Sequence, residues 1–265
     1  GYIVSGSANL ETYTTRHLRD DLHIPVTIGH HAENVHGADL VVYTVAILPD
    51  NPERVELERL GLPSIERATL LGQLMEGFDT AIGVCGAHGK TTTTSMCTHI
   101  FLAAGLDPTV MIGGTLPAIG SGYRVGKGET IILESCEYCN SFLSFFPTVA
   151  VILNVEEDHL DFFKDLADIQ HSFRRFAELV PPAGSVIVNA DNASAMEAVA
   201  GLEHPIFTFG LDHAADCTAA NLTEVDGRPV FDVMIRGEKY AHVELHVYGH
   251  HNVLNALAAA SAAWT

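Results

Sequence analysis

The sequence predicts an α/β protein: an incomplete Rossmann-like N-terminal domain, then a P-loop mononucleotide-binding α/β domain with a small antiparallel β portion. Three observations predict this fold class. Short apolar runs alternate with helical segments along most of the 265 residues. A Gly-Lys-Thr sequence, Gly89–Thr91, stands between an apolar run and a helical segment. After Cys217 the alternation gives way to short strands separated by turns, as in antiparallel hairpins.

The first domain is expected to cover residues 1–78. Its pattern predicts strands within 1–7, 25–30, 38–44 and 62–65, and helices over 10–22, 52–60 and 67–76. The nearly continuous apolar run Ala38–Thr44 is typical of a parallel strand that is buried on both faces. A Rossmann-like unit opens with a strand and a glycine-rich turn, and the chain starts downstream of any such turn. The domain is therefore expected to lack both.

The second domain is expected to cover residues 79–265. The pattern predicts strands at 80–84, 109–112, 130–133, 148–154, 185–188 and 206–209, and helices at 91–104, 165–179 and 252–264. Turns at Asp226-Gly227 and Arg236-Gly237 divide the segment 217–245 into hairpin strands.

The glycine-rich stretch around Lys90 predicts a phosphate-binding loop. Backbone N–H groups and the N-terminus of the following helix attract anions there. In such a loop Lys90 reaches the β- and γ-phosphates, and the Thr91 hydroxyl ligates Mg²⁺. The full consensus requires glycine where this chain has Val84, so an ordinary glycine turn before a helix is the alternative. The expected nucleotide-binding residues are Gly86, Ala87, His88, Gly89, Lys90, Thr91 and Thr92.

Two acidic segments follow predicted strands, where open α/β sheets bind their ligands. Glu134 directly follows the strand 130–133 and could ligate Mg²⁺, although a solvated acidic loop is the plainer explanation for Glu134 alone. His159 lies among four carboxylates after the strand 148–154. It could ligate a metal or orient the γ-phosphate, whereas a lone histidine is more often structural; its acidic surroundings favour function.

A third segment opens the last predicted helix. Asn252 and Asn255 are three residues apart and share one helix face. Their amides could read the edge of a nucleobase, with His251 packed against it. Asn252 could equally cap the helix, and this stretch alone does not decide between the two.

Composition excludes several classes of function. A net charge of −19 argues against binding to nucleic acid or to anionic membranes over the whole surface. No apolar run is long enough to span a bilayer, and the first residues do not form a signal peptide, so a cytoplasmic protein is expected. Five cysteines, an odd number, fit a reducing compartment. Cys136 and Cys139 have C-x-x-C spacing without a second pair, so buried or half-buried thiols are favoured over a zinc or redox site.

Four segments together resemble the Mur ligase family: Gly86–Thr93, Glu134–Tyr138, Asn154–Asp161 and Gly249–Asn255. The resemblance runs along the whole chain. The front of the chain, at Val4–Ser7, Gly29-His30 and Asp50–Glu53, resembles the UDP-sugar domain of the member that joins L-alanine to UDP-N-acetylmuramate.

The resemblance implies an ATP- and Mg²⁺-dependent ligase with UDP-N-acetylmuramate and L-alanine as substrates. ATP phosphorylates the lactyl carboxylate, and the amine of alanine attacks the acyl phosphate. Lys90, His88 and His159 are then the catalytic residues; Thr91 and Glu134 hold one Mg²⁺ and His159 a second. His251, Asn252 and Asn255 hold the adenine, and the UDP-sugar residues are Ser5, Ser7, His30 and Thr44.

Several departures from the family pattern matter. The family's C-terminal amino-acid-binding domain is absent from this chain, which is therefore expected to bind ATP weakly and to ligate poorly by itself. Other members carry a carbamylated lysine after the Asp-His pair. The helix 165–179 contains no lysine, and the alanine-adding member also lacks it. Ala87 replaces the usual threonine, and Asn9 stands where aspartate is common.

Two other functions are also compatible with the sequence. A sister ligase, of the muropeptide-recycling or folylpolyglutamate type, shares the ATP chemistry but uses another acceptor. A non-catalytic nucleotide-binding module could keep the fold alone. The joint presence of Lys90, Thr91, Glu134 and His159 argues against such a module.

Overall fold

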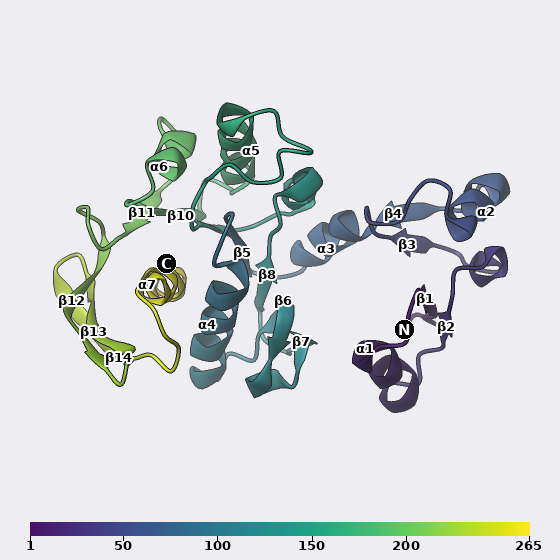
Figure 1. Ribbon diagram of the computed structural model, residues 1–265, viewed down its shortest axis with the longest axis horizontal. Coiled ribbons are helices and arrows are strands. Elements are labelled where there is room, and N and C mark those ends of the chain that lie inside the picture. The colour runs from purple at the N-terminus through teal and green to yellow at the C-terminus, as the bar shows by residue number, and fades with distance from the viewer. The chain divides into compact units, whose positions relative to one another are not determined.

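The computed structural model describes residues 1–265, which form two compact units, residues 1–70 and 71–265. Figure 1 labels the elements of both. No sheet is shared between the two units. The boundary expected near residue 78 stays a prediction.

The first unit contains two small parallel sheets. Strand β1 (Gly6–Ala8) pairs with β2 (Val26–Ile28), and β3 (Val41–Tyr43) pairs with β4 (Ser64–Glu66). The helices are α1 (Tyr13–Arg16), which continues as the π-helical turn η1 (His17–Asp21), the 3₁₀ turn η2 (Ala32–Val35) and α2 (Pro52–Leu60). Helix α2 has Asn51 as its N-cap, Pro52 in its first turn and the left-handed Gly61 at its end, which are all favourable positions for these residues.

The predicted buried strand 38–44 is wrong in two respects. Only Val41–Tyr43 are extended, and the Val42 side chain is 44% exposed. Strand β3 has β4 as its single neighbour, so its apolar residues lie in a two-stranded sheet rather than inside a wide one. The helix predicted at 10–22 is also shorter than expected, because it begins at Tyr13 and changes to π-helical geometry at His17.

The second unit is built on one ten-stranded sheet with the order β14-β13-β12-β11-β10-β9-β5-β8-β6-β7. The central strands β5 (Thr80–Cys85), β6 (Thr109–Leu116), β8 (Thr130–Glu134), β9 (Val149–Ile152), β10 (Ser185–Asn189) and β11 (Ile206–Phe209) run parallel. Strand β7 (Ser121–Arg124) closes one edge antiparallel to β6, after the 3₁₀ turn η3 (Pro117–Ile119). The carboxyl ends of β8, β5, β9 and β10 therefore meet at one edge of the sheet.

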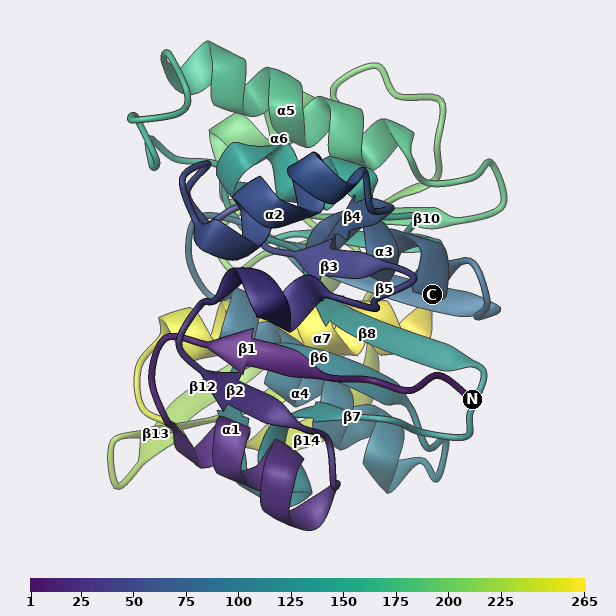
Figure 2. The ribbon, with the colours of Figure 1, turned by 90° about the vertical axis from the view of Figure 1, so that its right-hand side faces the viewer.

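Helices cover both faces of this sheet. Helix α4 (Lys90–Ala103) packs beside α7 (His251–Trp264) on one face, and α5 (Leu166–Glu178) and α6 (Ala193–Val199) lie on the other (Figure 2). Fully buried Ile82, Val84 and Ile132 of the sheet join the core under α4 and α7. On the opposite face, Phe142 of the 3₁₀ segment η4 (Tyr138–Ser144) stacks on Phe176 with ring centroids 4.7 Å apart.

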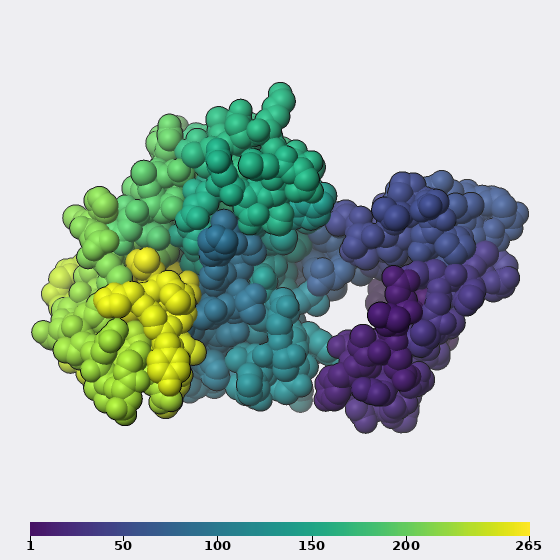
Figure 3. Space-filling model, in the orientation of Figure 1, coloured from purple at the N-terminus to yellow at the C-terminus, as the bar shows by residue number.

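The predicted antiparallel portion is formed by β12 (Cys217–Val225), β13 (Arg228–Ile235) and β14 (Glu238–Glu244). It continues the main sheet through the parallel pairing of Phe209 with Cys217. The C-terminal residues lie between these strands and α4 in the space-filling view (Figure 3). The predicted class, a Rossmann-like α/β unit followed by a P-loop α/β unit with an antiparallel portion, is confirmed.

None of the helices combines the length and the apolar character that crossing a membrane would need.

Candidate active site

The phosphate loop follows β5, and its backbone is held by Asn154, which follows β9. The Asn154 side chain accepts a hydrogen bond from the His88 N–H (2.8 Å) and donates one to the His88 carbonyl (3.0 Å). The backbone carbonyl of Asn154 accepts a further bond from the Ala87 N–H at 3.3 Å. This asparagine fixes the backbone of the loop at Ala87 and His88. Residue 154 was noted in the sequence as part of an acidic segment, but its role depends on β5 and β9 being neighbours.

Two glycines in the loop are required by its geometry. Gly86 and Gly89 have φ values of +142° and +86°. A Cβ atom on Gly89 would lie 2.5 Å from Oδ1 of Asn255, and one on Gly86 would lie 3.0 Å from Cβ of Leu153. Gly89 is also the N-cap of α4, so the first N–H groups of that helix remain available to an anion.

Lys90 is largely buried and points back into the loop. Its ammonium donates to the backbone carbonyls of Gly86 and Ala87 and to Oε1 of Glu137, which lies 3.0 Å away. The side chains of Lys90 and Glu137 are only 13% and 3% exposed. A buried carboxylate needs a cationic partner, and Lys90 supplies it. Glu137 belongs to the motif Glu134–Tyr138, but nothing in the sequence indicates this role for it.

Glu134 and Thr91 meet as predicted for one metal site. The Thr91 hydroxyl donates to Oε2 of Glu134 at 2.9 Å. The N–H of Gly113 donates to the same oxygen at 2.7 Å, so the carboxylate is held from the neighbouring strand β6. A Cβ at Gly113 would lie 2.8 Å from both carboxylate oxygens, so only glycine allows this close approach.

His159 and Lys90 both approach the carboxylate of Glu137. Its Nε2 is 3.7 Å from Oε1 of Glu137 and 3.8 Å from Oδ2 of Asp158. One ligand atom from each of these three residues lies within 4.8 Å of the others. The second oxygen of Glu137, Oε2, is buried and has no hydrogen-bond partner. A buried carboxylate that keeps one oxygen unpaired and lies next to a histidine and a second carboxylate fits a hard divalent cation.

Asn252 and Asn255 of the third predicted segment also lie near the loop, but their side-chain amides already form hydrogen bonds within the protein. Asn255 accepts from the Thr93 hydroxyl (3.2 Å) and donates to Oδ1 of Asn252 (3.0 Å). Asn252 donates to the carbonyl of Tyr248 at 2.7 Å. Asn252 does not cap α7, because the N-cap is His250, and His251 is exposed. The pair thus joins α7 to α4 next to Gly89, and its contact with adenine stays a prediction.

In the first unit, two of the four predicted UDP-sugar residues come together. Ser7 donates to Oε2 of Glu53 at 2.8 Å, and Nδ1 of His30 lies 3.0 Å from the same oxygen. Asn34 donates to the other oxygen of Glu53 at 2.6 Å. Burial raises the pKa of Glu53, but the hydrogen bonds from Asn34, Ser7 and His30 outweigh this effect and lower the pKa overall.

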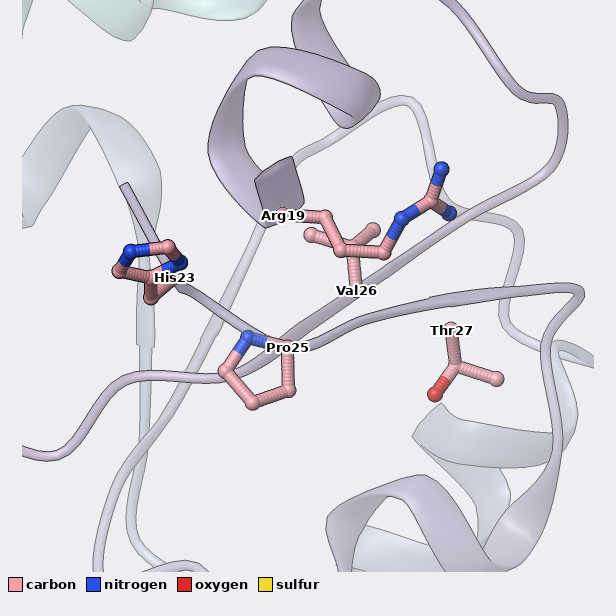
Figure 4. A pocket seen from close by; sticks show the side chains of 5 residues that line it. All are labelled: Arg19, His23, Pro25, Val26 and Thr27. Carbon is pink, nitrogen blue, oxygen red and sulfur yellow. The ribbon is translucent and has the colours of Figure 1, made fainter. Parts of the chain in front are cut away.

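Ser5 and Thr44 lie outside this cluster. Ser5 is exposed ahead of β1, and the Thr44 hydroxyl accepts only a local bond from the Ala46 N–H at 3.4 Å. Glu53 was part of a quoted segment, but no periodicity distinguishes a buried carboxylate from a solvated one. A separate hollow of the first unit is lined by Arg19, His23, Pro25, Val26 and Thr27, and none of the predicted residues lines it (Figure 4).

All five cysteines are free thiols. Cys85, Cys97 and Cys217 are buried as expected, and burial raises the pKa of Cys97 to about 12 and that of Cys217 to about 11. Cys136 is exposed, so the expectation of buried or half-buried thiols is wrong for this residue. In the sequence it lies between Glu134 and Glu137.

Comparison with known proteins agrees with this geometry. Residues 84–263 match the Mur ligase middle domain, and residues 1–79 match the Mur ligase family catalytic domain. The chain is 46% identical to the UDP-N-acetylmuramate–L-alanine ligase of Clostridium novyi over 263 residues, which are 99% of this chain and 57% of that protein. It is also 46% identical to the enzyme of that name from Caldanaerobacter subterraneus, over 97% of this chain and 56% of that protein.

Solved structures show the same likeness. A UDP-N-acetylmuramate–alanine ligase from Thermotoga maritima superimposes with a TM-score of 0.83 at 30% identity, covering 97% of this chain and 57% of that one. A UDP-N-acetylmuramate:L-alanyl-γ-D-glutamyl-meso-diaminopimelate ligase from Neisseria meningitides gives 0.87 at 28% identity, covering 98% and 85%. The chain therefore spans a little over half the length of the curated relatives it matches. With the family's two domain patterns matched in order along its length, this chain belongs to the Mur ligase family.

Proposed function

We propose that this chain is the substrate- and nucleotide-binding part of an ATP-dependent ligase that adds L-alanine to UDP-N-acetylmuramate in peptidoglycan precursor synthesis. One observation carries the catalytic part of the proposal. Lys90 and Glu137 form a buried ion pair beside the glycine loop, the partly exposed His159 lies 3.7 Å from Glu137, and Thr91, the next residue of α4, donates to Glu134. Their gathering at one edge of the sheet supports a site for a triphosphate and its metal ions.

The chemistry explains why these groups are needed. A carboxylate is a poor electrophile, and transfer of a phosphoryl group to it supplies a good leaving group for the attacking amine. Such a transfer depends on positioning and on neutralisation of negative charge. Lys90 would stabilise charge on the transferred phosphoryl group, and the loop N–H groups would orient the triphosphate.

The donor sets fit Mg²⁺ at two positions. Thr91 and Glu134 would hold one ion, and Glu137, Asp158 and His159 would hold a second. When bound, Mg²⁺ neutralises phosphate charge and so assists attack on phosphorus. Lys90 donates to Glu137 and to the loop carbonyls, and binding of a phosphate to Lys90 would replace part of this network. His88 is exposed at the loop's tip, 3.8 Å from Glu156, where it is free to meet a substrate carboxylate or phosphate.

The test of the nucleotide site is a Lys90→Ala variant titrated with fluorescent ATP and Mg²⁺. A charge-assisted hydrogen bond is worth about 1.5–3 kcal/mol, so the dissociation constant should rise about tenfold to a hundredfold. Lys127→Ala, which changes an exposed lysine outside the site, is the matched control and should bind as the wild type does. Unchanged binding by Lys90→Ala would favour a scaffold that has kept only the fold.

The acceptor is tested separately. UDP-N-acetylmuramate should raise the melting temperature, and a folate should not, because the proposed site is built for a UDP-sugar. Because the chain also superimposes on the Neisseria structure, a peptide-adding sister ligase is the second candidate. Product analysis with L-alanine and with an L-alanyl tripeptide in the same reaction separates the two.

A further inference from the structure

We propose that Tyr138 is a positioning residue that orients the His159 imidazole toward Glu137, with Asp161 anchoring the tyrosine. The inference rests on the proposed function, because it concerns how the second metal position is prepared. Tyr138 is the first residue of η4 and follows Glu137 directly. It was not among the predicted site residues.

The contacts of His159 show why it needs an external support. Its backbone has φ +53°, a left-handed conformation that is uncommon for a residue with a side chain. The loop that follows turns sharply, since the N–H groups of Phe162 and Phe163 both donate to the His159 carbonyl, at 2.8 and 2.9 Å. The imidazole is about one-third exposed, and its Nε2 is not within hydrogen-bond distance of either carboxylate beside it. No hydrogen bond to a protein group therefore fixes the ring.

Tyr138 supplies that support. Its ring lies against the imidazole with centroids 4.7 Å apart and an interplanar angle of 44°. Its hydroxyl donates to Oδ2 of Asp161 at 3.0 Å. The rings of Tyr138 and Phe162 also meet in a T-shaped arrangement, with centroids 6.2 Å apart. The tyrosine is held at both ends, by η4 and by Asp161, so it limits how far the imidazole can rotate away from Glu137.

The arrangement has a chemical consequence. Residues that orient a metal-binding histidine commonly change metal affinity about tenfold or more when they are removed. Loss of the Tyr138 ring should therefore free the His159 imidazole to sample other rotamers and weaken its bond to a divalent ion. Loss of the hydroxyl alone should have a smaller effect, because the ring contact remains.

The experiment uses Mn²⁺ alone as the probe, with electron spin echo spectroscopy of the whole chain. Nitrogen modulation from a coordinated imidazole is expected in the wild type and should disappear in His159→Gln. Tyr138→Leu should weaken both the modulation and the Mn²⁺ affinity, the latter about tenfold. Tyr138→Phe, which lacks only the hydroxyl bond, should weaken the affinity about threefold.

Controls separate this inference from the proposed function. Tyr240→Leu removes a half-exposed tyrosine that packs on Trp264, and it should leave the Mn²⁺ signal unchanged. Wild-type affinity and modulation in Tyr138→Leu, or in Tyr138→Phe if the leucine variant does not fold, overturn the positioning role while the metal site stands. Absence of imidazole modulation in the wild type overturns both the positioning role and the metal role of His159. The Lys90 titration then still tests the nucleotide site independently.

Discussion

At the scale of single residues, the active-site loop depends on backbone conformations that only glycine adopts easily. Gly89 has φ +86°, and its Cα faces Oδ1 of Asn255. Asn255 cannot easily move away, because Thr93 and Asn252 hold its amide from two sides. This close approach of Gly89 to Asn255 therefore couples the loop to α7, a helix more than 160 residues later in the chain.

Gly89→Ala tests this coupling. A left-handed conformation costs a non-glycine residue about 1–2 kcal/mol, and overpacking adds about 1–3 kcal/mol. Gly105→Ala is the matched control, because Gly105 also has positive φ (+74°) but nothing within 4 Å of its Cβ position. In urea unfolding, Gly89→Ala should lose more stability than Gly105→Ala and should also lose ATP affinity. Equal losses in the two variants would show that the Asn255 contact is not restrictive.

At the scale of elements, the start of α2 organises the first unit. Glu53, in the first turn of that helix, collects bonds from β1 through Ser7, from the turn after β2 through His30, and from η2 through Asn34. A carboxylate in the first helical turn also interacts favourably with the helix dipole. One side chain thus joins four segments that belong to different local structures.

The lowered pKa of Glu53 predicts a pH dependence of stability. A carboxyl group whose folded pKa lies below its unfolded pKa stabilises the fold above the unfolded value, about 4.3. This stabilisation is lost as the pH falls through the lower, folded value. The difference in melting temperature between wild type and Glu53→Gln should therefore be constant from about pH 5 to 7 and should shrink below about pH 4.3. A difference that stays constant down to pH 2 would contradict the role of the ionised carboxylate.

At the scale of the whole molecule, the division between the two units falls within helix α3 (Arg67–Met75). Residues from Leu71 onward belong to that unit. A Cβ at Gly72 would lie 1.8 Å from the Ser144 carbonyl oxygen, so the helix backbone packs directly on the chain after η4. Met75 is 1% exposed. The sequence pattern put the boundary after this helix, near residue 78.

Two fragments test the boundary. A fragment of residues 67–265 keeps α3, and one of residues 79–265 lacks it. Burial of a methionine side chain is worth about 1.5–3 kcal/mol, so the shorter fragment should unfold at a clearly lower urea concentration. The longer fragment should keep the nucleotide affinity of the whole chain. Equal unfolding midpoints for the two fragments would support a domain boundary near residue 78.

The sequence by itself determined the fold class, the phosphate loop and the strands whose ends carry Glu134 and Asn154. These depend on local patterns: apolar runs, glycines that permit special backbone conformations, and a lysine and threonine at a helix start. The same patterns misjudged Ala38–Thr44, because an apolar run does not reveal how many strands will flank it.

Only the tertiary structure decided which side chains share a site. The pairing of Lys90 with Glu137, the clamp of Asn154 on His88 and the support of His159 by Tyr138 join segments that are 21 to 66 residues apart. The order of strands in the sheet sets these distances, and the strand order is not encoded in any single segment. Burial, which removes water as a competing partner, then makes each of these polar contacts specific.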